Sequence, residues 1–62
     1  MVKTLADINA KRAERSVTAR DLATYTGYSY DAVRSILSGR RKLTKRFLVI
    51  CRKVFAELDR NA

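Results

Sequence analysis

The chain has no histidine and a single cysteine, Cys51. A disulfide needs two cysteines, and an ordinary zinc site is built from several histidine and cysteine ligands. The sequence also has no glycine-rich phosphate loop, no cluster of carboxylates and no pair of residues that could act as nucleophile and base. Because acid–base and nucleophilic catalysis need such groups, we expect no enzyme activity, no metal, no other cofactor and no small-molecule substrate.

Proline is absent and glycine occurs twice, a composition that suits helices. The longest apolar run, residues 47–51, has five residues, whereas a membrane-spanning helix needs about 20. The N-terminal segment lacks the apolar core of a secretory signal. We therefore expect an all-α protein that does not cross a membrane. Its single cysteine fits a reducing compartment, and we expect the cytoplasm.

Acidic residues are few and unevenly placed. The chain has 6 Asp and Glu against 14 Lys and Arg, for a net charge of +8. No acid occurs between Asp31 and Glu57, and this interval holds the basic residues Arg34, Arg40, Arg41, Lys42, Lys45, Arg46, Arg52 and Lys53. A solvent-exposed helix face normally mixes charges of both signs. The one-sided stretch therefore favours a polyanionic partner such as nucleic acid.

A chain of 62 residues forms at most one domain, so we treat residues 1–62 as a single unit. A chain this short buries a smaller fraction of its surface than a larger domain does, and its stability alone is marginal. Neither a disulfide nor a zinc site can reinforce it. We therefore expect self-association.

The centre of the chain has the pattern of two short helices joined by a tight turn. Thr18, with an aspartate three residues later, forms a capping box that begins a helix over 19–26. Gly27 follows, where a left-handed bend favours a residue without a side chain. Ser29 can then cap a second helix over 30–38. Helices this close, joined by a short turn containing glycine, form a helix-turn-helix.

The small residues of this segment make the pattern more specific. Ala23, Gly27 and Val33 lie where two closely crossing helices need a small residue, a glycine and a β-branched residue. The segment resembles the helix-turn-helix of small phage repressor and Cro-type regulators, from Thr18 to roughly Leu58. The likeness is carried by Leu22-Ala23, Gly27-Tyr28-Ser29, Ala32-Val33 and Ser38-Gly39. One departure is Ala19, which replaces a glutamine that contacts the DNA backbone in many members.

The resemblance implies a four-helix, repressor-like DNA-binding fold and a sequence-specific transcriptional regulator of double-stranded DNA. It further implies a repressor from a phage or mobile element, acting as a homodimer on a pseudo-palindromic operator in bacterial or phage-infected cytoplasm. The alternative is a nonspecific, nucleoid-type DNA-binding protein, because a basic composition would serve that function equally well. A basic amphipathic protein that lies on anionic membranes is a further class.

Outward-facing residues of the predicted helix 30–38 are the candidates for contact with DNA bases. They are Tyr30, Asp31, Arg34, Ser35 and Ser38. Arg34 can donate two hydrogen bonds to a guanine, and Tyr30 can meet a thymine methyl group or a phosphate. Asp31 can accept a hydrogen bond from cytosine. Alternatively, Asp31 in the first turn interacts favourably with the helix dipole, or it pairs with Arg34 on the surface.

Candidates for contact with the DNA backbone surround this helix. They are Thr18, Arg20, Ser29, Arg40, Arg41, Lys42, Lys45 and Arg46. Lys45 and Arg46 open a predicted helix, where the dipole disfavours cations. A local cost of this kind is better explained by phosphate binding than by folding.

Two outer helices complete the predicted fold. A Thr4 capping box begins a helix from Leu5 to Glu14 or Arg15, after a frayed segment over 1–3. Cations near the end of this helix suit its dipole, and the alternative is phosphate contact by Lys3, Lys11 or Arg12. Thr44 caps the last helix, from Lys45 to Leu58 or Asp59.

The last helix has two apolar stripes at helical spacing. The first, which we expect to cover the other helices, contains Leu43, Phe47, Ile50, Val54 and Leu58. The second contains Leu48, Cys51 and Phe55. We interpret this second stripe as the interface of a homodimer, with a larger core as the alternative.

Overall fold

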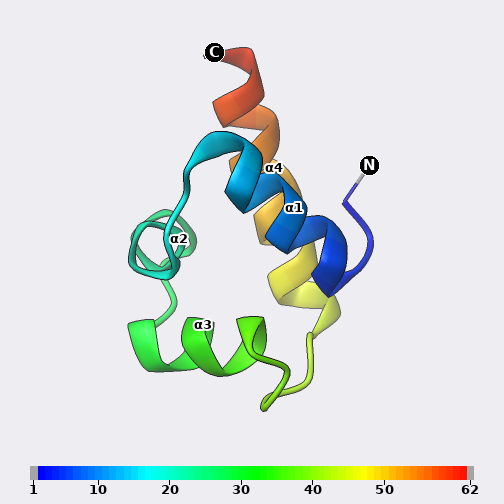
Figure 1. The fold of residues 1–62 in the computed structure, drawn as a ribbon, viewed down its shortest axis with the longest axis vertical. Coiled ribbons are helices and arrows are strands. Elements are labelled where there is room, and N and C mark those ends of the chain that lie inside the picture. Colours follow the sequence, from blue (N-terminus) through cyan, green and yellow to red (C-terminus); the bar gives the residue numbers. More distant parts are fainter. Residues whose placement is uncertain (1, 62) are drawn as a thin grey trace.

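The computed structural model describes residues 2–61, which fold into four α-helices and contain no β-strand (Figure 1). The helices are α1 (Leu5–Arg15), α2 (Ala19–Thr26), α3 (Tyr30–Leu37) and α4 (Lys45–Arg60). The predicted all-α architecture of four helices is thus confirmed for the described residues. Among these helices, none combines the length and the apolar character needed to cross a membrane.

Each helix begins at a hydroxyl that accepts a hydrogen bond from a backbone N–H three residues later. These caps are Thr4, Thr18, Ser29 and Thr44, as predicted. At α1 and α2 an aspartate returns the hydrogen bond, because Asp7 accepts from the Thr4 N–H at 3.0 Å and Asp21 from the Thr18 N–H at 3.2 Å. The caps provide acceptors for N–H groups that have no partner within the helix. Because each cap involves only residues close in sequence, the predicted helix starts are correct.

The turn between α2 and α3 depends on Gly27. Its φ of 79° is left-handed, and its N–H donates to the carbonyl of Ala23 at 3.0 Å. A Cβ atom at Gly27 would meet no other atom within 4 Å, so the backbone conformation and not lack of space favours glycine. In Figure 1 α2 is seen end-on while α3 runs across the view, so the two helices cross at a wide angle. Ala23 of α2 and Val33 of α3 are buried, and these two helices pack together.

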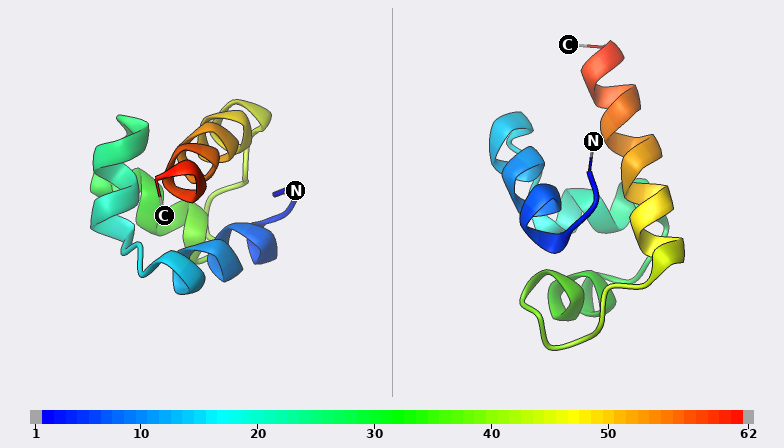
Figure 2. Two further views of the ribbon diagram at one scale, coloured as in Figure 1. Left: turned by 90° about the horizontal axis from the view of Figure 1, so that it is seen from above. Right: turned by 90° about the vertical axis from the view of Figure 1, so that its right-hand side faces the viewer.

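The core lies between α4 and the other three helices (Figure 2). Its largest fully buried side chains are Ile8 of α1, Leu22 of α2, Val33 and Ile36 of α3, and Phe47, Cys51 and Phe55 of α4. The ring of Tyr28 packs edge-on against Phe47, with centroids 4.8 Å apart. α4 contacts α1 and α2, and α2 packs on α3, so α2 links α3 to the rest of the fold.

The predicted dimer interface on α4 is wrong for two of its three residues. Cys51 is fully buried and Phe55 is 1% exposed in the chain's own core, while Leu48 is partly buried against that core. The inner line of α4 is Phe47, Cys51 and Phe55, at a spacing of four residues. Ile50, which we expected inside, is only partly buried. The alternative of a larger core is therefore correct for Cys51 and Phe55, and burial raises the pKa of the Cys51 thiol to about 11.

The segment before α1 is held in place, contrary to the frayed N-terminus that we expected. Val2 is 7% exposed, and its carbonyl accepts a hydrogen bond from Arg52 Nε of α4 at 2.6 Å. The Lys3 N–H donates to the Asp7 carboxylate at 2.9 Å. These contacts join the segment to two helices at once. Met1 lies outside the described residues.

Candidate nucleic-acid interface

The surface of α3 divides into a buried and an exposed side. Val33 and Ile36 face the core, with 0% and 2% of their surface exposed. The opposite side carries the predicted base-contacting residues, of which Tyr30, Asp31, Arg34 and Ser38 are exposed and Ser35 is half-buried. The structure therefore leaves these side chains on one accessible face, because the amphipathic pattern of α3 turns its apolar side inward.

Four of these residues line a common surface hollow with the loop that follows α3. The hollow has a volume of about 290 Å³, and its lining residues are Asp31, Arg34, Ser35, Ser38 and Arg40. Guanidinium groups and hydroxyls donate hydrogen bonds, while the carboxylate accepts them. The hollow can therefore present donors and an acceptor to the edge of a polar partner. Asp31 and Arg34 form no ion pair in the structure, so the surface pair considered from the sequence is absent.

Tyr30 occupies a separate position on the same face. The guanidinium carbon of Arg20, on α2, lies 5.0 Å from the centre of the Tyr30 ring, and that of Arg34 lies 5.9 Å from it. Cations within about 6 Å of a ring centre are attracted by its negative face. The sequence does not predict the contact between Arg20 and Tyr30, because this contact depends on how α2 crosses α3. It brings Arg20 to the exposed face of α3.

The loop after α3 is hydrogen-bonded to the end of that helix and has exposed cationic side chains. Gly39 adopts a φ of 85°, and the Arg41 N–H donates to the Ser35 carbonyl at 3.0 Å. This hydrogen bond joins the loop to the end of α3, and Figure 2 shows the loop running beside that helix. Arg40, Arg41 and Lys42 are exposed, and Lys45 and Arg46 are exposed in the first turn of α4. The predicted backbone-contacting cations of this segment are thus exposed, and Arg40 lines the hollow together with residues of α3.

Within residues 2–61, the basic residues of this surface have no ion-pair partner. The described ion pairs use Lys11, Arg15 and Arg60 as cations, and Glu14, Glu57 and Asp59 as anions. None of them involves Arg20, Arg34, Arg40, Arg41, Lys42, Lys45 or Arg46. Asp31 lines the same hollow as Arg34 and Arg40, but the cations of this surface outnumber it, so an excess of positive charge is available to an anionic partner.

The hydroxyl groups among the predicted backbone contacts have structural roles. Thr18 Oγ1 accepts from the Asp21 N–H at 3.0 Å, and Ser29 Oγ accepts from the Ala32 N–H at 3.1 Å. Both residues are exposed. Each cap uses the hydroxyl as an acceptor, which leaves its hydrogen free to donate to another group. Capping and contact with a phosphate oxygen are therefore compatible at these two positions.

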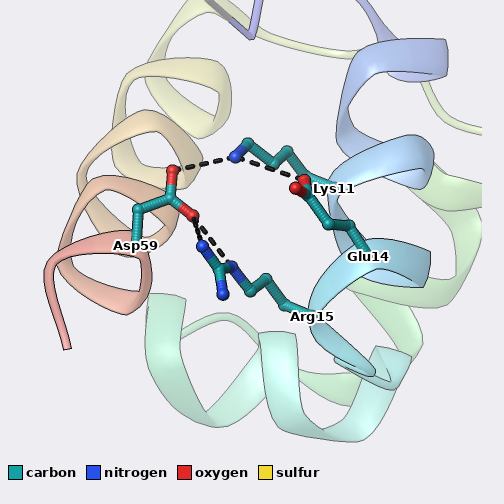
Figure 3. A network of polar contacts seen from close by, with 4 residues as sticks. All are labelled: Lys11, Glu14, Arg15 and Asp59. Carbon is teal, nitrogen blue, oxygen red and sulfur yellow. Dashed lines mark hydrogen bonds and ion pairs between the residues drawn. The ribbon is translucent and has the colours of Figure 1, made fainter. Parts of the chain in front are cut away.

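The opposite end of the molecule holds a network that the sequence did not reveal. Asp59 near the end of α4 accepts hydrogen bonds from Lys11 Nζ at 2.8 Å and from Arg15 Nε at 2.9 Å, both on α1 (Figure 3). Glu14 lies 3.3 Å from Lys11. The hydrogen bond from Lys11 lowers the pKa of Asp59, and the same bond raises the pKa of Lys11. Lys11, a candidate for phosphate contact, thus pairs with carboxylates of the chain itself.

Comparisons of the chain with models of protein families, with curated proteins and with solved structures gave no match. The resemblance to phage repressor and Cro-type regulators therefore stays a prediction from the motif.

Proposed function

We propose that this chain is a sequence-specific regulator of transcription that binds double-stranded DNA through α3. In this proposal α2 and α3 act as a helix-turn-helix, and the exposed face of α3 enters the major groove, which is wide enough for an α-helix. The basic loop after α3 lies along the sugar–phosphate backbone beside the groove.

One observation carries the proposal. The exposed face of α3 is followed along the chain by exposed cations in the loop and in the first turn of α4, for which the described residues provide no ion-pair partner, and Arg40 of this loop lines the hollow on α3. Specific recognition of DNA needs groups that read base edges, flanked by cations that bind phosphates on either side of the groove. The polar hollow on α3 and the cationic loop match these two requirements in adjacent places.

The residues have distinct proposed roles. Arg34 donates two hydrogen bonds to guanine O6 and N7, the commonest specific contact in the major groove. Asp31, Ser35 and Ser38 offer further donors and acceptors to base edges from the same hollow. The cations of the loop and of the first turn of α4, together with Arg20, Thr18 and Ser29, bind phosphates. Such contacts set the register of the protein on the duplex, but they do not read its sequence.

We further propose that the chain represses transcription as a homodimer on a pseudo-palindromic site. Two recognition helices would then lie about 34–36 Å apart, one turn of the duplex. The interface excludes Cys51 and Phe55, because both are buried within one chain. Sedimentation equilibrium with and without a symmetric duplex tests this state. A single chain bound per duplex at saturation would contradict it.

The experiment that tests the proposed function is selection of bound duplexes from a random-sequence library, followed by competition. We expect the selected duplexes to share a short site, and binding to one of them to persist in excess random-sequence DNA. A nonspecific, nucleoid-type protein would enrich no common site, and random-sequence DNA would displace it from every duplex alike. That outcome would overturn the proposed function and support the alternative.

A further inference from the structure

We propose that Tyr30 is a positioning residue that holds the guanidinium groups of Arg20 and Arg34 in the arrangement used on DNA. This inference rests on the proposed function, and it gives Tyr30 a role other than direct contact with a base or a phosphate. It also assigns Arg20, which belongs to α2, to the recognition surface of α3.

The geometry around Tyr30 carries the inference. Tyr30 is 40% exposed, and the two guanidinium carbons lie 5.0 and 5.9 Å from the centre of its ring. Arg34 lies one helical turn after Tyr30 on α3, whereas Arg20 comes from the first turn of α2. One ring therefore collects cations from both helices. Its negative face offsets part of the repulsion between two positive charges that share a small area.

A ring positions an arginine differently from a carboxylate. A carboxylate occupies N–H donors, as Asp59 does with the Nε and Nη2 groups of Arg15. An aromatic ring attracts the guanidinium through its electrostatic field. This attraction does not require any of the five N–H donors to bond to the ring. Because the ring carries no net charge, it also does not neutralise the positive charge of the arginine. Arg20 and Arg34 are both exposed and form no ion pair in residues 2–61, so their donors and charges remain available to a duplex.

The consequence is a gain in affinity through preorganisation. A free arginine loses side-chain entropy when a duplex fixes it, and a ring that already restricts the side chain reduces this loss. Contacts of this kind at exposed sites correspond to about two- to fivefold in an equilibrium constant. If the guanidiniums had to leave the ring in order to bind DNA, the same contacts would weaken binding. Whether removal of the ring lowers or raises the affinity for DNA therefore decides the role of Tyr30.

The test compares Tyr30→Leu with Tyr30→Phe, using a duplex selected from a random library as the probe. Tyr30→Phe keeps the ring, and we expect it to bind like the parent. Tyr30→Leu should lose about two- to fivefold in affinity, while the dependence of affinity on salt stays the same, because no cation is removed. Tyr25→Leu is the matched control, since Tyr25 is 51% exposed on α2 and has no described cation near its ring. An equal or higher affinity for Tyr30→Leu, or a loss in Tyr30→Phe as large as that in Tyr30→Leu, would overturn the inference.

A second measurement needs no DNA and separates this inference from the proposed function. NMR relaxation of the arginine Nε–Hε groups in the free protein should show Arg20 and Arg34 more ordered than Arg41, a loop arginine. Tyr30→Leu should remove this difference, and Tyr30→Phe should keep it. If the ordering does not depend on the ring, the inference is wrong even if the chain binds DNA specifically. If the ordering is present but no duplex is selected, the proposed function fails and the role in binding fails with it.

Discussion

The two ends of this molecule use charged residues in opposite ways. At one end α1 and α4 are joined through Asp59, which pairs with Lys11 at 2.8 Å and with Arg15 at 2.7 Å (Figure 3). At the other end α3 and the following loop carry cations for which residues 2–61 provide no ion-pair partner. The same residue types thus connect helices at one end and remain free at the other.

The placement of the few acids explains this difference. Asp7 and Asp21 are used in capping boxes, while Glu14, Glu57 and Asp59 take part in ion pairs. Of the 6 acids, only Asp31 has neither role within the described residues. Seven of the 14 basic residues, Arg20, Arg34, Arg40, Arg41, Lys42, Lys45 and Arg46, lie on α3, in the loop after it or beside it, so a large part of the net charge of +8 is found there. Charge that the fold does not use internally is the charge expected to meet a partner.

The largest expected effect comes from breaking the core on which both ends depend. Phe55→Glu places a carboxylate where the native side chain is 1% exposed. Because an unpaired charge cannot be buried without a large cost, we expect loss of the fold, seen as loss of helical circular dichroism. Ala56→Glu, at the neighbouring exposed position, is the control and should fold. A folded, monomeric Phe55→Glu protein would instead support the dimer interface that the structure contradicts.

The next effect separates the two ends by their contribution to DNA binding. Replacing Arg40, Arg41 and Lys42 with Ala should weaken binding to all duplexes by roughly tenfold or more. The slope of log affinity against log salt should become shallower by about 0.9 for each phosphate that the variant no longer neutralises. Lys11→Met combined with Arg15→Met removes two cations from the other end and should leave this slope unchanged. Equal slopes for the loop variant and the parent would rule out phosphate binding by the loop.

A smaller effect concerns the turn that sets α3 against α2. Gly27→Ala forces a residue with a Cβ atom into a φ of 79°, and left-handed backbone costs such residues about 1–2 kcal/mol. We expect the free energy of unfolding, measured with urea, to fall by that amount. Gly27→Asn should lose less, because asparagine tolerates this conformation better. If Ala is as stable as Gly here, the backbone of the turn differs from the one described.

The smallest effects on stability come from Asp59 at the ion-paired end and from Asp7 in the capping box of α1, and they depend on pH. The pKa values of Asp59 and Asp7 are lowered from 3.8, mainly by the hydrogen bond from Lys11 and by backbone hydrogen bonds respectively. A carboxyl group whose pKa is lower in the folded state than in the unfolded state stabilises the fold at pH values above its unfolded-state pKa. This stabilisation is lost as the pH falls through the folded-state pKa. We therefore expect the melting temperature to drop below about pH 4.

Asp59→Asn is the matched variant for this pH dependence. It should melt slightly below the parent at neutral pH, by less than Gly27→Ala does, because exposed ion pairs contribute little. The difference between the two proteins should shrink as the pH falls below about 4. A difference that is constant with pH would show that the ionised carboxylate of Asp59 is not what stabilises this end.

Local signals in the sequence predict the helices of this fold well. Thr18 with Asp21, and Gly27 at the turn, act through hydrogen bonds and backbone angles that involve only nearby residues. The starts of all four helices follow from such signals. The outward residues of α3 are also predictable, because its apolar pattern has one clear inner side.

Contacts between distant segments could not be predicted in the same way. α4 carries two apolar stripes, and periodicity alone does not say that Cys51 faces the core while Ile50 is left partly exposed. The pairs of Asp59 with Lys11 and Arg15 join residues more than 40 positions apart. The Arg20–Tyr30 contact likewise depends on the crossing of two helices. Each requires the packed arrangement, which no single stretch of the sequence specifies.

The central claim is that the α3 end, and not the Asp59 end, binds the duplex. Titration of the isotopically labelled chain with a selected duplex, followed by NMR, tests this claim most directly. We predict that backbone signals shift most over residues 29–46, while those of residues 7–15 and 57–60 change little. Shifts centred on α1 and the end of α4, or no shifts with any duplex, would contradict the account.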